Sequence, residues 1–131
     1  MDNNRFKPHR SWCSKFARAF RGVAVGVRGQ SSFAVHFTCT ALVLGAAVVL
    51  RVTLVEWCLL LLCITLVLSA EMFNGALESL ARAIDEEYNA HLADGLDVAS
   101  SAVLLAAGGA STVGVIIFLN RAIELLAVRV Y

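Results

Sequence analysis

Three polar side chains, Glu71, Asn74 and Glu78, follow directly on a long apolar run of the chain. Each residue of a helix advances about 100°, so Asn74 lies about 60° and Glu78 about 20° from Glu71. The three groups therefore share one narrow stripe, with roughly 10 Å along the axis between the two carboxylates. A carboxylate at membrane depth is costly, which makes this stripe a candidate functional site. The alternative is a helix that has left the bilayer and carries a solvated polar face.

The stripe combines the side chains that phosphoryl transfer to an alcohol requires. A carboxylate at the membrane interface can act as general base and accept the proton of an alcohol that is itself in the membrane. A second carboxylate can hold Mg²⁺, which takes oxygen ligands and bridges to phosphates. Channels, transporters and structural helices also carry acidic faces, so the spacing by itself does not select an enzyme.

The composition is that of a membrane protein. The 131 residues suffice for one compact domain, and 59% of them are apolar, above the 45–50% that is typical of soluble domains. Seven of the eleven basic residues precede residue 30, and eight of the ten acidic residues fall between Glu56 and Asp97. The four cysteines form no pair separated by two residues, so a disulfide framework or a zinc site is not expected.

Three apolar runs predict an all-α membrane protein with three transmembrane helices, at about residues 33–50, 57–77 and 98–119. The apolar part of the second run, residues 57–70, is too short to cross a bilayer, so its helix must carry Glu71 into or near the membrane. Residues 85–97 are predicted to be an acidic connection that faces water. Residues 1–12 are predicted to be a mobile tail, and residues 13–131 a single integral-membrane domain.

Residues 13–29 mix basic and apolar side chains at helical spacing, which predicts an amphipathic helix on the membrane surface. A targeting peptide is the rival interpretation, but no clean apolar region with a small-residue cleavage site is present. The basic residues are expected to attract anionic lipid headgroups rather than nucleic acid. They also predict a cytoplasmic N-terminus, which places the acidic connection on the cytoplasmic side as well.

The pattern Glu71-x-x-Asn74-x-Ala76-x-Glu78 resembles the signature of the small bacterial membrane lipid kinases, the prokaryotic diacylglycerol kinases and the related undecaprenol kinases. The resemblance extends over about residues 15–107 with the same spacing from Glu71. It includes the segments Phe16-x-x-Ala19-Phe20-x-Gly22-Val23, Phe33-x-x-His36, Glu56-Trp57, Glu87-Tyr88 and Asp97-x-x-x-x-Ala102-Val103-Leu104. The Glu56-Trp57 segment is closer to the undecaprenol kinase branch.

This resemblance implies a homotrimer whose active sites lie between subunits at the cytoplasmic face and transfer the γ-phosphoryl group of ATP to a lipid alcohol. It implies that Glu71 is the catalytic base and that Glu78 and Gln30 are the Mg²⁺ ligands. Asn74 and Ser100 correspond to substrate-binding positions. The positions that contact the nucleotide are Glu87, Tyr88 and Asp97.

Several positions depart from the pattern of this family. Gln30 replaces a metal-binding glutamate, Arg82 replaces an aspartate, and Leu96 replaces a lysine that faces the phosphates. Arg82 lies within about 20° of the stripe and could reach a phosphate, or it could form a plain i, i+4 pair with Glu78. His36 is expected to be a packed histidine bonded across helices rather than a proton relay.

The expected function is therefore that of a lipid kinase that uses ATP and Mg²⁺ to phosphorylate diacylglycerol or undecaprenol. The departures at Gln30, Arg82 and Leu96 support an alternative from another class, a weakened or inactive relative that acts as a structural or lipid-binding membrane protein.

Overall fold

The described residues form four helices, α1 (Trp12–Val27), α2 (Ser31–Val49), α3 (Leu54–Ile84) and α4 (Ala90–Val130). The structure, a computed structural model, describes residues 12–28, 31–84 and 89–130, with Ser31 and residues 128–130 described by their backbone only. Most of the predicted mobile tail, residues 1–11, lies outside the described residues, and α1 begins already at Trp12.

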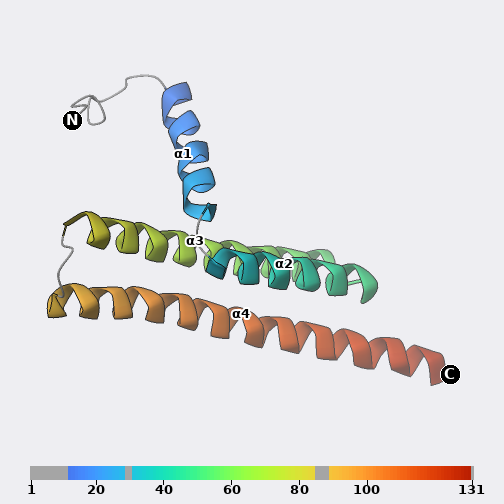
Figure 1. The fold of residues 1–131 in the computed structure, drawn as a ribbon. Coiled ribbons are helices and arrows are strands. Elements are labelled where there is room, and N and C mark those ends of the chain that lie inside the picture. Colours follow the sequence, from blue (N-terminus) through green and yellow to red (C-terminus); the bar gives the residue numbers. More distant parts are fainter. Residues whose placement is uncertain (1–11, 29–30, 85–88, 131) are drawn as a thin grey trace.

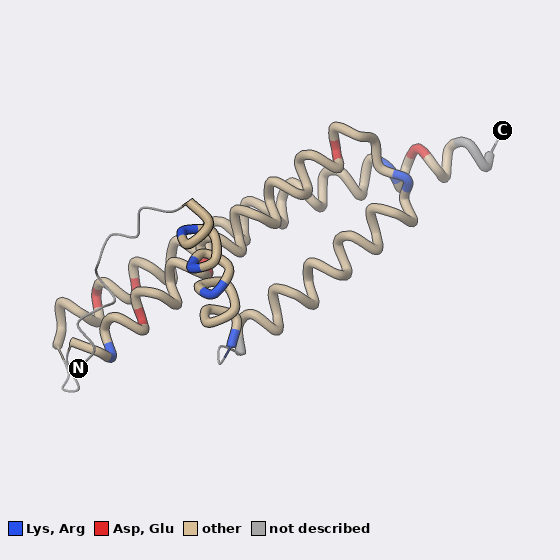
Figure 2. Tube along the Cα trace, turned by 90° about the horizontal axis from the view of Figure 1, so that it is seen from above, with Lys and Arg blue, Asp and Glu red and all other residues tan. Residues whose placement is uncertain are grey.

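The three long helices lie side by side and alternate in direction, and α3 packs mainly against α4 (Figure 1). The shorter α1 stands crosswise to them and meets α3 near the start of α2. Each of α2, α3 and α4 contains a stretch long and apolar enough to cross a membrane. Figure 2 shows that the charged residues gather toward the two ends of this bundle, with uncharged helix between them.

Local sequence signals explain where the helices begin. Thr53 precedes α3 and accepts a hydrogen bond from the Glu56 amide on its Oγ1 (3.4 Å), while Glu56 Oε2 accepts one from the Thr53 amide (2.7 Å). This reciprocal arrangement is a capping box. Asn89 precedes α4, and its Oδ1 accepts hydrogen bonds from the amides of His91 and Leu92. Arg51 has a φ of 50° in the tight turn between α2 and α3.

Apolar side chains pack together toward the end of the bundle where α2 turns into α3. Ala47, Val52, Leu60 and Ile117 are buried there in one apolar cluster. Arg121 of α4 donates a hydrogen bond from Nε to Glu56 Oε2 (2.7 Å) and one from Nη1 to Glu124 Oε2 (2.6 Å). This ion-pair group ties the beginning of α3 to α4 and fixes the relative height of the two helices.

The helix α4 is longer than the predicted third span at both of its ends. Residues 90–97 belong to α4 rather than to a connection, because the Asn89 cap starts the helix before the first acidic residue of this stretch. At its other end α4 continues to Val130, beyond the predicted third span at residues 98–119. The acidic side chains of residues 94–97 therefore project from a rigid helix, which limits how they can reach a ligand.

Candidate functional site

The predicted stripe of α3 lies at the point where α2 and α4 both approach this helix. Glu71 is only 3% exposed and Asn74 is 8% exposed, while Glu78 is partly open to solvent. Asn74 donates a hydrogen bond from Nδ2 to Glu78 Oε1 (2.9 Å). The stripe is therefore not a solvated face, because two of its three side chains are covered by neighbouring helices.

The length of α3 indicates the depth at which the stripe lies. Glu71 follows Leu54 by 17 residues, about 26 Å of helix, and Glu78 follows it by 24 residues, about 36 Å. A bilayer has a hydrocarbon core about 30 Å thick. If Leu54 stood at one boundary and α3 ran along the bilayer normal, the Glu71 carboxylate would lie just inside the opposite boundary and Glu78 just outside it. That is the depth where a lipid hydroxyl meets water.

Two residues of α2 hold the Glu71 carboxylate. The Ser32 hydroxyl donates a hydrogen bond to Glu71 Oε1, and His36 Nε2 lies 3.6 Å from Glu71 Oε2. Ser32 and His36 are four residues apart and so face the same side of their helix. His36 is thus packed across the helix interface next to the candidate base, but at 3.6 Å it forms no hydrogen bond with it, so the predicted bond across helices stays a prediction. Ser32 was not recognised from the sequence, where only its spacing to His36 could have indicated it.

The α4 helix adds Ser100 to the group formed by Glu71, Asn74, Glu78, Ser32 and His36, and we call these six residues the polar cluster. The Ser100 hydroxyl lies 3.4 Å from Asn74 Oδ1 and 3.0 Å from the Leu96 carbonyl oxygen, to which it donates. Asn74 therefore stands between Ser100 on one side and Glu78 on the other. The structure brings together Glu71, Asn74, Glu78 and Ser100 from the predicted site, and adds Ser32 and His36.

Of the other predicted site residues, the structure describes only Asp97. Asp97 lies exposed on α4, one turn before Ser100, and its carboxylate has no ion pair within the described parts of the chain. Gln30, Glu87 and Tyr88 lie outside the described residues. Their expected contacts with metal and nucleotide stay predictions.

Arg82 forms the expected i, i+4 pair with Glu78, but the pair is loose. Arg82 Nη2 lies 3.8 Å from Glu78 Oε2, and the Arg82 side chain is 72% exposed. An exposed pair at this distance contributes a few tenths of a kcal/mol at most. Arg82 is therefore free to turn toward another anion.

The Glu78 carboxylate offers oxygen atoms of the kind that Mg²⁺ prefers. Within residues 12–28, 31–84 and 89–130, no three His, Cys, Asp or Glu side chains converge to form a complete metal cage. Mg²⁺ in phosphoryl-transfer enzymes is commonly bound by one or two carboxylates together with phosphates and water. A single half-exposed carboxylate next to an amide fits this mode of binding, because the remaining ligands come from substrate and solvent.

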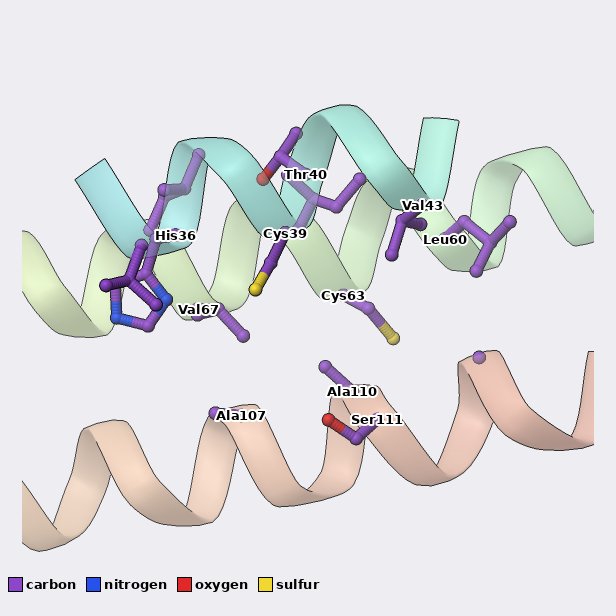
Figure 3. A pocket seen from close by; sticks show the side chains of 14 residues that line it. His36, Cys39, Thr40, Val43, Leu60, Cys63, Val67, Ala107, Ala110 and Ser111 are labelled. Atoms are coloured by element: carbon purple, nitrogen blue, oxygen red, sulfur yellow. The ribbon is translucent and has the colours of Figure 1, made fainter. Parts of the chain in front are cut away.

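A cavity of about 300 Å³ lies between α2, α3 and α4 and has His36 at one end (Figure 3). Most of its lining is apolar, and polar atoms come from His36, Thr40 and Ser111. Cys39 and Cys63 also face it. Val67, which lines this cavity, precedes Glu71 by one helical turn. An apolar space of this kind next to the carboxylate suits the chain of a lipid.

Known proteins resemble this chain over the segment that contains the polar cluster. The family model of prokaryotic diacylglycerol kinases matches residues 17–118, which contain the whole polar cluster. The undecaprenol kinase of Bacillus subtilis (strain 168) is 26% identical to this chain over 119 residues, which cover 88% of this chain and 97% of the relative.

Proposed function

The chain belongs to the prokaryotic diacylglycerol kinase family, and we propose from this membership that it transfers the γ-phosphoryl group of ATP to a membrane lipid alcohol. The observation that carries the proposal is the buried Glu71 carboxylate, which accepts a hydrogen bond from Ser32 and lies 3.6 Å from His36 Nε2. A burial of this kind is costly without a role, and a carboxylate so positioned can meet the hydroxyl of a lipid.

In the proposed reaction the Glu71 carboxylate accepts the proton of the lipid hydroxyl. The hydroxyl oxygen forms a bond to the γ-phosphorus of ATP, and the bond from that phosphorus to the bridging oxygen breaks, which releases ADP. Ser32 and His36 keep the carboxylate directed toward this hydroxyl. Asn74 orients Glu78, and Mg²⁺ bound at Glu78 would neutralise the charge on the phosphates.

The proposal extends to surroundings of the site. We place the basic N-terminal helix and the stripe on the cytoplasmic side of the inner membrane, because basic segments stay there and ATP is available there.

A homotrimer would cover many of the large apolar side chains that the long helices expose. Gln30, Glu87, Tyr88 and Asp97 would complete the contacts with metal and nucleotide. The name of the Bacillus subtilis relative favours undecaprenol over diacylglycerol as the acceptor.

The test is phosphoryl transfer by the purified protein in lipid nanodiscs. With ATP labelled in the γ-phosphate and Mg²⁺ present, we expect labelled phosphate to appear in undecaprenol or in diacylglycerol, and to disappear when Mg²⁺ is chelated. The alternative, an inactive relative, is favoured by Arg82, which lies against Glu78 where a metal would bind. No transfer to either lipid over a wide range of Mg²⁺ concentrations would establish that alternative.

Ser32→Ala is expected to lower kcat by about tenfold and to leave the KM for ATP nearly unchanged. The substitution removes the hydroxyl that bonds Glu71 Oε1, so the carboxylate keeps its proton-accepting oxygen but loses its orientation. A lost hydrogen bond to a buried charged group corresponds to about 1.5–3 kcal/mol, and a tenfold change in rate to about 1.4 kcal/mol. Steady-state kinetics measure both constants.

Ser101→Ala is the matched control, because the hydrogen bond of Ser101 Oγ stays within its own helix, at the Asp97 carbonyl (2.8 Å). An unchanged kcat in Ser32→Ala would remove Ser32 from the site.

A further inference from the structure

A second hollow of about 350 Å³ lies between α1 and α3, next to the polar cluster but separate from the apolar cavity. Its walls come from the C-terminal half of α1 and from the part of α3 that follows Glu71. The residues that line it are Gly22, Val25, Gly26, Arg28, Met72, Gly75, Ala76, Ser79 and Arg82. We call this hollow the α1–α3 groove.

Small side chains make the α1–α3 groove. A Cβ atom added to Gly26 would lie 2.8 Å from Met72 Sδ, so the glycine lets the two helices approach closely at that point. A Cβ atom added to Gly22 would meet nothing within 4 Å. The groove therefore has open space beside Gly22, whereas the Met72 side chain occupies it beside Gly26.

The charge of the groove is positive. Arg28 lines it from the side of α1, and Arg82 lines it from the side of α3. Within the described residues Arg28 has no carboxylate within ion-pair distance, and Arg82 has only the loose contact with Glu78 at 3.8 Å. Two arginines that share a groove repel each other, and an anion between them removes this repulsion.

Arginine recognises phosphate better than other side chains do, because its planar guanidinium group donates two parallel hydrogen bonds to phosphate oxygens. We propose that the α1–α3 groove binds a phosphate-bearing group, with Arg28 and Arg82 as its ligands. One source is the phosphate chain of a nucleotide, since Arg82 lies next to Glu78. The other source is the phosphate of an anionic lipid, since α1 is the candidate surface helix.

Binding of a nucleotide in the groove would add a binding site to the proposed kinase function and rests on that function. Binding of phosphate in the groove does not depend on any transfer reaction. The probe is therefore inorganic tripolyphosphate, which carries the phosphates of ATP without its base or sugar. The full chain in phosphatidylcholine nanodiscs is titrated with this probe by calorimetry. A second set of nanodiscs, which contain phosphatidic acid and no tripolyphosphate, is compared with phosphatidylcholine by measuring the thermal stability of the protein.

We expect tripolyphosphate to bind, and Arg28→Gln and Arg82→Gln each to weaken its binding by about tenfold. Arg21→Gln is the matched control, because Arg21 lies on α1 but does not line the groove, and it should change the affinity little. Gly22→Leu fills the groove while both arginines remain, and it should also weaken binding. Binding that survives all three groove substitutions unchanged would overturn the proposal for the nucleotide source.

The comparison of nanodiscs with and without phosphatidic acid tests whether the phosphate comes from a lipid. If tripolyphosphate binding does not depend on the arginines, but phosphatidic acid stabilises the wild type and not Arg28→Gln or Arg82→Gln, the groove binds the phosphate of a lipid. No dependence on either arginine in either arm would overturn the proposal as a whole. Arginine-dependent binding of tripolyphosphate in a protein that transfers no phosphate to lipid would support the groove and contradict the proposed kinase activity.

Discussion

Glu71→Gln is expected to reduce phosphoryl transfer by about 10²–10⁴-fold while the protein stays folded. The carboxamide can still accept a hydrogen bond from Ser32 and has nearly the same volume, so the packing between α2 and α3 is retained. It cannot accept a proton from a lipid hydroxyl, and general-base catalysis contributes a factor of this size. Single-turnover measurements with labelled ATP give the rate of the chemical step directly.

The matched control for this variant is Glu124→Gln, which changes a carboxylate at the far end of the bundle. Glu124 bonds Arg121 at 2.6 Å and lies outside the polar cluster, so its loss should leave the rate of transfer almost unchanged. A second control is tripolyphosphate binding, which Glu71→Gln should not alter, because Glu71 does not line the α1–α3 groove. Transfer at the wild-type rate in Glu71→Gln would leave a kinase whose base lies elsewhere.

The fold was largely predictable because its strongest signals are local. Three apolar runs of sufficient length predict three long helices, and the structure contains them at Ser31–Val49, Leu54–Ile84 and Ala90–Val130. The start of α4 was not predicted, because the acidic composition of residues 90–97 suggested a loop. The decisive signal was Asn89, whose side chain caps the two amides that follow.

The candidate site was predictable within one helix and not between helices. The spacing of Glu71, Asn74 and Glu78 places them on one face of any helix, and the structure joins Asn74 to Glu78. The contacts of Glu71 with Ser32 and of Asn74 with Ser100 depend on how far each helix slides along its neighbours. That height is set at the other end of the bundle, by packing at Ala47 and Leu60 and by the ion pair of Arg121 with Glu56, which no periodicity of the polar residues reveals.

The structure agrees with both interpretations of Arg82 that the sequence allowed, a helical pair with Glu78 and a phosphate ligand. The contact of Arg82 with Glu78 agrees with the plain helical pair, and its place in the α1–α3 groove agrees with phosphate binding. The two do not compete strongly, because a pair that is largely exposed holds the guanidinium group with little free energy. A phosphate that carries Mg²⁺ would take Arg82 away from Glu78 and free that carboxylate for the metal.

Glu78→Gln is the second substitution with a large expected effect, a loss of about a hundredfold in kcat/KM at fixed Mg²⁺. The amide keeps an oxygen that can accept the hydrogen bond of Asn74 Nδ2, so the local geometry is retained, but the negative charge that attracts Mg²⁺ is lost. Stabilisation of phosphate charge by a metal amounts to several kcal/mol, and about 2.7 kcal/mol corresponds to a hundredfold change in rate.

The measurement that separates a metal ligand from a positioning residue is the dependence of the rate on Mg²⁺ concentration. In Glu78→Gln the Mg²⁺ concentration for half-maximal activity should rise, and Glu78→Asp, which keeps the charge, should recover part of the activity at high Mg²⁺. Asn74→Ala removes the same hydrogen bond from the other partner and leaves the Glu78 charge, so it should lower the rate without a comparable shift in Mg²⁺ dependence. If Glu78→Gln and Asn74→Ala lower the rate equally and neither shifts the Mg²⁺ dependence, Glu78 acts by holding Asn74 and the metal is bound by other residues.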